Sequence, residues 1–302
     1  MNRVAKFLAH EGRVSLVCSN TTEMINEIKN IHDLTPTTTA ALGRFATITG
    51  MMGFTEIKDT EDYLTVQMNG KGPMGTLISV VRREAFTSKV KVCTDNPHVE
   101  IPLKSNGKLD VSGAVGQNGF LNIINKNEVT DTNYTGLVPI VTGEIAEDFT
   151  EYFAKSEQKN TAVALGVLVD KDGVKSAGGY IITPMPDATE EEISKIEQSI
   201  FKAGAISKML DQKLSLEEIA KKVTGDENIK LIEENITPIY ECDCSKEHMA
   251  DGIATLDKSV LKEMIEEDGK AELVCHFCNK KYDFNKEELE KILDEKIKNE
   301  IK

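Results

Sequence analysis

Cys242-Asp243-Cys244, near the C-terminal end of the chain, is followed after thirty residues by Cys275-His276-Phe277-Cys278. Four of the six cysteines lie in these two pairs. Two close cysteine pairs brought together form a tetrahedral site of four sulfur ligands, with zinc–sulfur bonds of roughly 2.3 Å. Soft thiolates in this geometry favour zinc or an iron–sulfur cluster over hard cations. Because four protein ligands leave no open position, the spacing predicts a structural metal site at Cys242, Cys244, Cys275 and Cys278.

The alternatives to a metal site are two unrelated cysteine pairs or two disulfides. A disulfide across Cys242-Asp243-Cys244 would close a very small ring. Disulfides far from the preferred geometry store strain and are easier to reduce. Thiolates that bind a cation stay deprotonated, which is the reactive form of cysteine. We therefore expect the same four residues to act as a metal site in one redox state and as a thiol switch in the other.

Length, charge and composition limit the classes of protein to which the chain can belong. The 302 residues suggest two domains, or one domain with appendages. The chain has no apolar run long enough to span a bilayer and no visible signal peptide, so we expect a cytoplasmic protein with reduced cysteines and no membrane partner. A net charge of −14 and only 5% aromatic residues argue against binding to nucleic acid.

Residues 1–185 read as one mixed α+β domain. Alternating or β-branched runs predict strands over 13–18, 63–68, 76–81, 161–169 and 178–182, and a further β pattern over 89–124. Apolar residues at helical spacing predict helices over 21–32, 35–52 and 144–154. Cys18 and Cys93 lie in apolar, strand-like surroundings, which is typical of inert core cysteines.

A glycine-rich stretch, Gly70-Lys71-Gly72-Pro73-Met74-Gly75, matches the fingerprint of dinucleotide-binding sites. That fingerprint requires a helix next, with its N-terminus facing the pyrophosphate. The β-branched stretch Thr76–Val81 predicts a strand instead, and Pro73 removes a backbone donor from the loop. We therefore expect a hairpin turn and no cofactor.

A helical linker domain is predicted over residues 186–238, after the boundary signal Pro184-Met185-Pro186-Asp187. Capping boxes pair Thr189 with Glu192 and Ser215 with Glu218 at the starts of two helices. The apolar face of the first helix is expected to continue through Ile193, Ile196, Ile200 and Ile206. Residues 239–302 follow as the four-cysteine module, with a helix expected between the cysteine pairs and another after Asn285.

Several stretches resemble one family, the 33 kDa chaperonins, which are redox-regulated heat-shock holdases. The C-x-C…C-x-x-C pattern is the hallmark of that family. The other matching stretches are His32-Asp33-Leu34-Thr35-Pro36, Ala41-Leu42-Gly43-Arg44, Gly70–Gly75, Tyr134-Thr135-Gly136-Leu137-Val138-Pro139 and Tyr152-Phe153-Ala154-Lys155-Ser156-Glu157-Gln158. The resemblance covers essentially the whole chain. One departure is Lys246-Glu247-His248, where many members have an arginine-rich stretch, and His248 is a fifth candidate ligand beside its more ordinary reading as a surface histidine.

The resemblance implies a chaperone that works without ATP and is not an enzyme. The reduced form, with one zinc ion per chain, is expected to be inactive. Under oxidative stress, Cys242 is expected to pair with Cys244 and Cys275 with Cys278, with release of zinc and loosening of the C-terminal module and the helical linker. The exposed surface is then expected to bind unfolding client proteins and prevent their aggregation, with a homodimer as the active form.

Two other classes of protein share parts of this pattern. A zinc-ribbon nucleic-acid binder would need a basic surface, whereas residues 241–302 contain 17 acidic residues and 11 lysines, a formal charge of −6. A thiol–disulfide oxidoreductase would place its Cys-x-x-Cys at the start of a helix. The residues after Cys278 predict a β-ribbon instead, so we expect neither activity.

Overall fold

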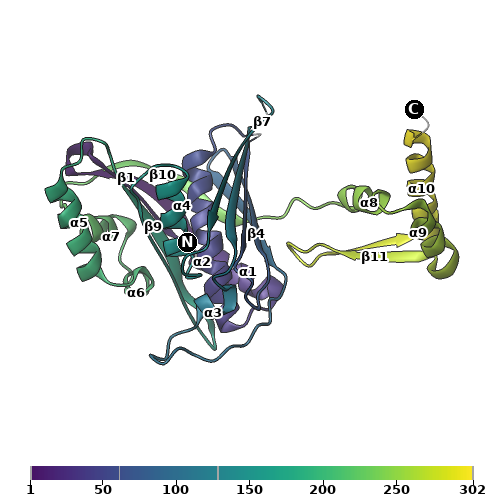
Figure 1. Ribbon diagram of the computed structural model, residues 1–302, viewed down its shortest axis with the longest axis horizontal. Helices are drawn as coiled ribbons and strands as arrows, with labels where there is room; N and C mark the ends of the chain where they lie inside the picture. Colours follow the sequence, from purple (N-terminus) through teal and green to yellow (C-terminus); the bar gives the residue numbers. More distant parts are fainter. Residues whose placement is uncertain (1, 61, 128, 301–302) are drawn as a thin grey trace. The chain divides into compact units, whose positions relative to one another are not determined.

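The computed structural model describes residues 2–60, 62–127 and 129–300 and divides into two compact units, Met1–Glu241 and Cys242–Lys302 (Figure 1). Both contain helices and strands, which confirms the predicted α+β class. The predicted division into a core domain (1–185), a helical linker domain (186–238) and a four-cysteine module (239–302) stays a prediction. No helix in the described part of the chain is both long and apolar enough to cross a membrane.

A ten-stranded sheet forms the frame of the first unit, in the order β7-β6-β3-β4-β5-β10-β1-β2-β9-β8. Neighbouring strands are antiparallel, except that β10 runs parallel to β5. The strands are β1 (Arg3–Ala9), β2 (Val14–Asn20), β3 (Tyr63–Asn69), β4 (Leu77–Glu84), β5 (Thr87–Thr94), β6 (Phe120–Asn127), β7 (Thr132–Pro139), β8 (Ala162–Asp170), β9 (Gly173–Pro184) and β10 (Lys230–Tyr240). The helices are η1 (His10–Gly12), α1 (Thr22–His32), α2 (Pro36–Glu56), α3 (Val111–Val115), α4 (Ala146–Lys155), α5 (Glu190–Ala203), α6 (Ile206–Asp211) and α7 (Leu216–Thr224).

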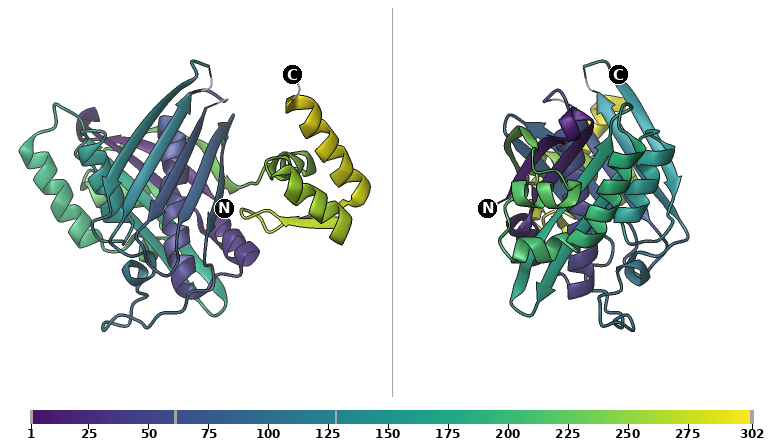
Figure 2. Two further views of the ribbon diagram at one scale, coloured as in Figure 1. Left: turned by 45° about the vertical axis from the view of Figure 1, so that its right-hand side comes forward. Right: turned by 90° about the vertical axis from the view of Figure 1, so that its left-hand side faces the viewer.

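Helix α2 forms the centre of this unit. It is apolar or small on every side and almost wholly buried, as expected for a helix surrounded by protein. It packs against strands of both halves of the sheet, β4 and β5 on one side and β8 and β9 on the other. The views in Figures 1 and 2 agree in placing α2 inside the curve of the sheet. Its glycines allow this close approach, since a Cβ on Gly53 would lie 2.3 Å from a methyl group of Val81.

Helices α5, α6 and α7 cover the other face of the β1, β2 and β9 part of the sheet. They share one apolar core with the strands, in which Phe7, Leu16 and Tyr180 lie under residues of all three helices. The helix side of this core is Ile196 from α5, Ile206, Met209 and Leu210 from α6, and Leu216, Ile219, Ala220 and Val223 from α7. Both predicted capping boxes are present, at Thr189 and at Ser215.

The structure differs from the sequence-based expectation in three places. Residues 230–240 form strand β10, which follows the predicted helices and lies between β5 and β1. The β pattern expected over 89–124 is interrupted after Thr94 by a long irregular segment with the short helix α3, and it resumes at Phe120 in β6. Helix α5 ends at Ala203 because Gly204 has φ +76°, so Ile206 begins a new helix instead of extending the same face.

The glycine-rich stretch is a loop between strands β3 and β4, as expected, and its glycines serve backbone packing. Gly72 donates a hydrogen bond to the carbonyl of Val115 (3.0 Å). A Cβ on Gly72 would lie 2.5 Å from the carbonyl oxygen of Ala114. The stretch therefore brings two backbone segments together, which accounts for its glycines without a dinucleotide.

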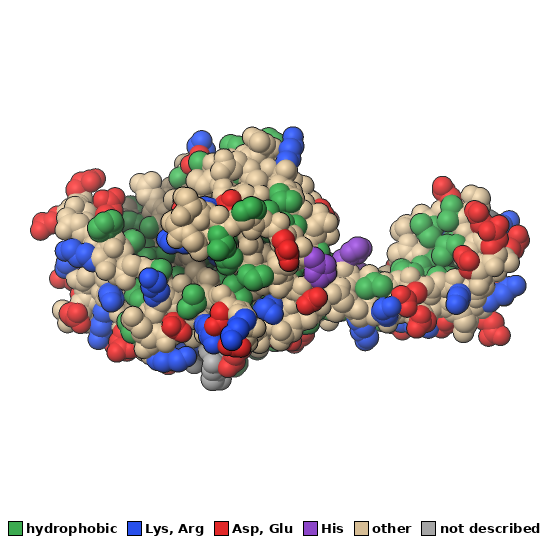
Figure 3. All heavy atoms as spheres, turned by 90° about the horizontal axis from the view of Figure 1, so that it is seen from below, with side chains coloured by type: hydrophobic (Ala, Val, Ile, Leu, Met, Phe, Trp, Pro, Cys, Tyr) green, Lys and Arg blue, Asp and Glu red, His purple; other side chains and the backbone are tan. Residues whose placement is uncertain are grey.

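The second unit is small. It contains α8 (Lys246–Ala254), α9 (Lys258–Glu263), one π-helical turn η2 (Met264–Asp268), the antiparallel hairpin of β11 (Lys270–Val274) and β12 (Lys281–Asn285), and α10 (Lys286–Glu300). The predicted cap of the last helix is present, because Asn285 and Glu288 exchange side chain–backbone hydrogen bonds of 3.0 Å. On the face shown in Figure 3, acidic and basic side chains are interspersed.

Gly72→Ala tests the packing role of the glycine-rich loop. The added methyl group meets backbone atoms that cannot turn away, so we expect a loss of about 3 kcal/mol in the free energy of unfolding. Gly107→Ala is the matched control, because Gly107 has open space around it and only its φ of +76° opposes a side chain; its expected loss is about 1 kcal/mol. Urea unfolding measures both, and equal losses would contradict the packing role.

Candidate metal centre

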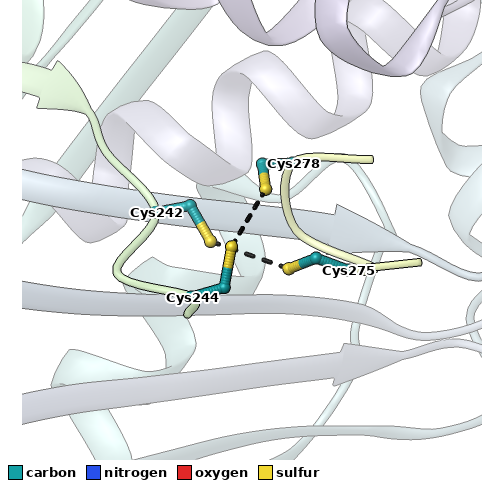
Figure 4. Close-up of side chains that lie close together, drawn as sticks. All are labelled: Cys242, Cys244, Cys275 and Cys278. Carbon is teal, nitrogen blue, oxygen red and sulfur yellow. Dashed lines mark hydrogen bonds between the residues drawn. The ribbon is translucent and has the colours of Figure 1, made fainter. Parts of the chain in front are cut away.

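The second unit brings together the four cysteines of the two pairs. Their sulfur atoms all lie within 4.8 Å of one another (Figure 4). The Sγ atoms of Cys242 and Cys275 are 3.7 Å apart, and those of Cys244 and Cys278 are 3.4 Å apart. These separations exceed a disulfide bond of about 2.05 Å. They approach the roughly 3.8 Å edge of a tetrahedron whose metal–sulfur bonds are about 2.3 Å. The residues present therefore fit a tetrahedral metal ion.

Local backbone structure holds each pair in place. Cys275 and Cys278 lie in the turn between β11 and β12, where the amide of Cys275 donates to the carbonyl of Lys280 (3.0 Å) and the amide of Asn279 to that of Cys275 (2.8 Å). Asn279 has φ +58°, a conformation that asparagine tolerates well. Cys242 and Cys244 lie just before α8, whose first turn is capped by the side chain of Ser245. The hairpin turn thus fixes Cys275 and Cys278, whereas Cys242 and Cys244 lie in an extended segment that leads into the capped helix α8.

The thiols form part of the core of this unit. Cys275 is buried, and the other three are partly buried against the same apolar cluster. That cluster consists of Ile253, Leu261, Ile265, Cys275, Tyr282, Phe284, Leu289 and Ile292. The unit comprises only residues 242–302, and a chain of this length buries a small fraction of its surface. A ligand common to all four sulfurs would therefore stabilise the whole unit.

Tyr282 is a residue of the site that the sequence analysis did not identify. Its hydroxyl lies 2.9 Å from the carbonyl oxygen of Cys244 and 3.1 Å from its sulfur, and it donates to them. The side chain comes from β12 and is buried. In the sequence, the alternation of Tyr282 and Phe284 indicates that both side chains face inward. The hydrogen bond to Cys244 could not be predicted, because the two residues are 38 positions apart.

Burial and hydrogen bonding have opposite effects on the thiols. Burial raises the pKa of Cys242, and it raises the pKa of Cys278 to about 11. Burial acts in the same direction at Cys244, but hydrogen bonds from the Tyr282 hydroxyl and the neighbouring thiols outweigh it, so that the pKa of Cys244 is lowered. Burial thus disfavours the thiolate at Cys242 and Cys278. A bound cation would favour the thiolate form of every ligand.

The other residues considered in the sequence analysis lie outside the cluster. His248 is exposed in the first turn of α8, and the cysteine cluster found among the described residues does not include it. Cys18 is buried in β2, where burial raises the pKa of its thiol to about 12, and Cys93 is buried in β5. After Cys278 the chain enters strand β12, as predicted, and not the helix of a thioredoxin-type site.

The chain is similar over nearly its full length to proteins of one family. The family described as Hsp33 protein matches residues 2–285. Among the relatives of this chain, the 33 kDa chaperonin of Bacillus velezensis is 41% identical to it over 296 residues, which cover 98% of this chain and 99% of the relative. The 33 kDa chaperonin of Bacillus subtilis (strain 168) has the same identity and coverage.

One solved structure is also similar throughout. It is the crystal structure of a 33 kDa chaperonin (heat shock protein 33 homolog) from Thermotoga maritima, with a TM-score of 0.88 and 32% sequence identity. The match covers 98% of this chain and 99% of the other. The family resemblance deduced from the sequence is thereby confirmed.

Tyr282→Phe tests how the hydroxyl at Cys244 affects metal affinity. Groups that hydrogen-bond to a ligand tune its orientation and basicity, so we expect metal affinity to fall by about tenfold. Competition with a chromophoric chelator measures the affinity, and Co²⁺ absorption reports whether the site remains tetrahedral. Tyr63→Phe, in β3 of the first unit, is the control. Unchanged affinity in Tyr282→Phe would exclude this role.

Proposed function

The chain belongs to the Hsp33 family, and we propose that it is an ATP-independent holdase chaperone that oxidation activates. The observation that carries the proposal is the cluster of four thiol sulfurs inside the small core of the second unit. In this proposal the chain is cytoplasmic and is not an enzyme. Its partners are unfolding proteins, and the active form is a homodimer.

Cys242, Cys244, Cys275 and Cys278 would hold one zinc ion in the reduced form. Four sulfur ligands in a tetrahedral arrangement suit zinc and leave no position for a substrate, so the role is structural. In finger peptides, structural zinc supplies folding free energy on the order of 10–16 kcal/mol. That exceeds the stability of many whole domains, about 5–15 kcal/mol, so the second unit would depend on its four thiolates for its fold.

Oxidation removes ligands two at a time. A hydroperoxide takes two electrons from a pair of cysteines, one S–S bond forms, and the peroxide O–O bond breaks to give an alcohol and water. Pairing Cys275 with Cys278 and Cys242 with Cys244, as the family resemblance implies, would leave no thiolate in the cluster. The core residues around Leu261 and Phe284 would then lose the metal–thiolate cluster against which they pack.

The helical segment α5–α7 covers the surface that we assign to client binding. Its residues bury Phe7, Leu16 and Tyr180 on the sheet. In chain order, α7 is followed by strand β10, and β10 ends at Tyr240, two residues before Cys242. Release of α5–α7 would expose an apolar face of the kind that binds unfolded chains.

The turn between β1 and β2 secures these helices. Arg13 donates to both carboxylate oxygens of Glu192 at the start of α5, with the shortest contact at 2.6 Å, and this bond lowers the pKa of Glu192 to about 2. The backbone amide of His10 donates to Asp226, just beyond α7 (2.6 Å). The segment α5–α7 therefore has anchors within the first unit, which supports a second, separate step of activation.

A chaperone assay before and after oxidation tests the proposal. We expect one zinc per chain and no suppression of client light scattering in the reduced protein, and metal loss with suppression after oxidation by peroxide. Combined Cys275→Ser and Cys278→Ser should abolish metal binding, because two of the four ligands are gone. Its holdase activity should no longer depend on oxidant.

The control is the combined Cys18→Ser and Cys93→Ser variant, which leaves the cluster intact and should behave as the original protein. Metal that survives loss of Cys275 and Cys278 would refute the assignment of ligands. Suppression of aggregation that does not change on oxidation would refute the switch while leaving the metal site in place.

A further inference from the structure

We propose that a cavity in the first unit is a binding site for a primary ammonium group on a short apolar chain. The cavity has a volume of about 340 Å³, which is within the range of small-ligand sites. Eleven residues line it: Met52, Glu56, Leu64, Ile123, Asn125, Tyr134, Tyr152, Phe153, Ser156, Glu157 and Gln158. It lies in a different unit from the four cysteines, and the switch does not use it.

Two sequence stretches that match the family but have no part in the switch contribute to this cavity. The stretch Tyr134–Pro139 in β7 supplies Tyr134, and the stretch Tyr152–Gln158, at the end of α4 and just beyond it, supplies five lining residues. The Tyr134 hydroxyl donates to the carbonyl oxygen of Ser156 (3.1 Å). A Cβ on Gly136 would lie 2.4 Å from the Ser156 hydroxyl and 2.6 Å from the Tyr152 ring, so this glycine lets the strand and the helix end meet.

The lining of the cavity combines aromatic side chains, which attract cations, with aliphatic side chains, which pack against an alkyl chain. Tyr134, Tyr152 and Phe153 are the aromatic residues, and the rings of the last two meet edge to face with centroids 5.6 Å apart. Aromatic faces attract ammonium groups, and more strongly where water is excluded. Met52, Leu64 and Ile123 supply aliphatic surface against which an alkyl chain can pack. An apolar chain with a cationic end matches both features.

The charge of the cavity is negative. Among the described residues that line it, Glu56 and Glu157 are acidic and none is basic. The side chains of Glu56 and Glu157 are 30% and 21% exposed, so both are partly buried at the cavity. The Tyr152 hydroxyl donates to Glu157 (3.0 Å), which fixes one oxygen of that carboxylate. A carboxylate accepts about four hydrogen bonds, so capacity remains for a ligand.

Lys159 shows which chemistry the carboxylates attract. Its ammonium nitrogen donates a hydrogen bond to Glu157 (3.4 Å) and lies 4.0 Å from Glu56, the outer limit of a direct ion pair. The side chain is 44% exposed, so the pair is largely solvated and weak. Lys159 thus balances one of the two negative charges loosely. A ligand ammonium inside the cavity would approach the same oxygens more closely and with less water.

Titration of the reduced protein with n-butylammonium chloride tests the site. The chain has six tyrosines and no tryptophan, so Tyr134 and Tyr152 are two of its six main emitters, and a change in tyrosine fluorescence accompanies binding. Calorimetry gives the affinity. We expect saturable binding at constant ionic strength and none with n-butanol, which has the same chain without the charge. Equal binding of n-butanol, or no binding of the amine at millimolar concentrations, would overturn the proposal.

Three variants test whether the amine binds at the carboxylates of this cavity. Glu157→Gln should weaken it by about tenfold, because a charge-assisted hydrogen bond is lost. Glu151→Gln is the control, because Glu151 lies in α4, six residues before Glu157 and outside the cavity, and it should bind as the original protein. Lys159→Met should strengthen binding by about threefold, since it removes the competing ammonium. A purely structural role of these residues would not produce tighter binding, so unchanged or weaker binding in Lys159→Met would overturn the proposal.

Two natural sources share this chemistry, a free alkylamine and a lysine side chain of a protein. Nα-acetyl-lysine N-methylamide distinguishes them. Tighter binding of this compound than of n-butylammonium supports the site and assigns it to a protein lysine, whereas weaker binding supports the site and assigns it to a free amine. Every measurement uses the reduced protein without a client, so failure of the switch would not affect the result.

Discussion

The convergence of four sulfur atoms on one point is the constraint on which the second unit depends. Its core contains few large apolar side chains, and Cys275 lies among them. A chain of this length is marginally stable without a staple. The hairpin β11–β12 and the segment before α8 are tied together through the cluster and through the bond from Tyr282 to Cys244. A chemical change at the thiols therefore acts on the fold of the entire unit.

The first unit is stabilised in a different way. Its centre is a helix that is buried on all sides, and its sheet is continuous from β7 to β8. The helices α5–α7 have capping boxes, a shared apolar core and the ion pair between Arg13 and Glu192. None of these interactions involves the four cysteines. The stability of the first unit therefore rests on interactions other than those of the thiol cluster.

Local signals allowed much of this structure to be predicted from the sequence. The capping boxes at Thr189 and Ser215, and the strand after Gly75, are specified by residues a few positions apart, and each is present in the structure. The cysteine spacing likewise predicted that the four sulfurs would meet. Strand β10 escaped prediction because its sequence, with paired glutamates and Pro238, shows no clear alternation, and its partners β1 and β5 are distant in the chain.

Contacts between residues distant in the chain also explain why the sequence analysis missed Tyr282 at the metal centre and the cavity in the first unit. Tyr282 reaches Cys244 across 38 positions. The cavity beside Tyr152 combines the end of α2, three strands and the end of α4, and only the fold brings them together. The sequence showed that the stretches around Tyr134 and Tyr152 match a family pattern. It did not show that they face one another.

Hydrogen exchange during stepwise oxidation tests the central claim most directly, that the thiol cluster holds only the second unit. The turn between β11 and β12 accommodates a disulfide of ordinary geometry, whereas Cys242 and Cys244 close a tighter ring, so the Cys275–Cys278 bond should form first. At that stage, residues 242–302 should lose protection while residues 190–224 keep it. Simultaneous loss of protection in both segments after the first disulfide would show that the cluster also holds α5–α7.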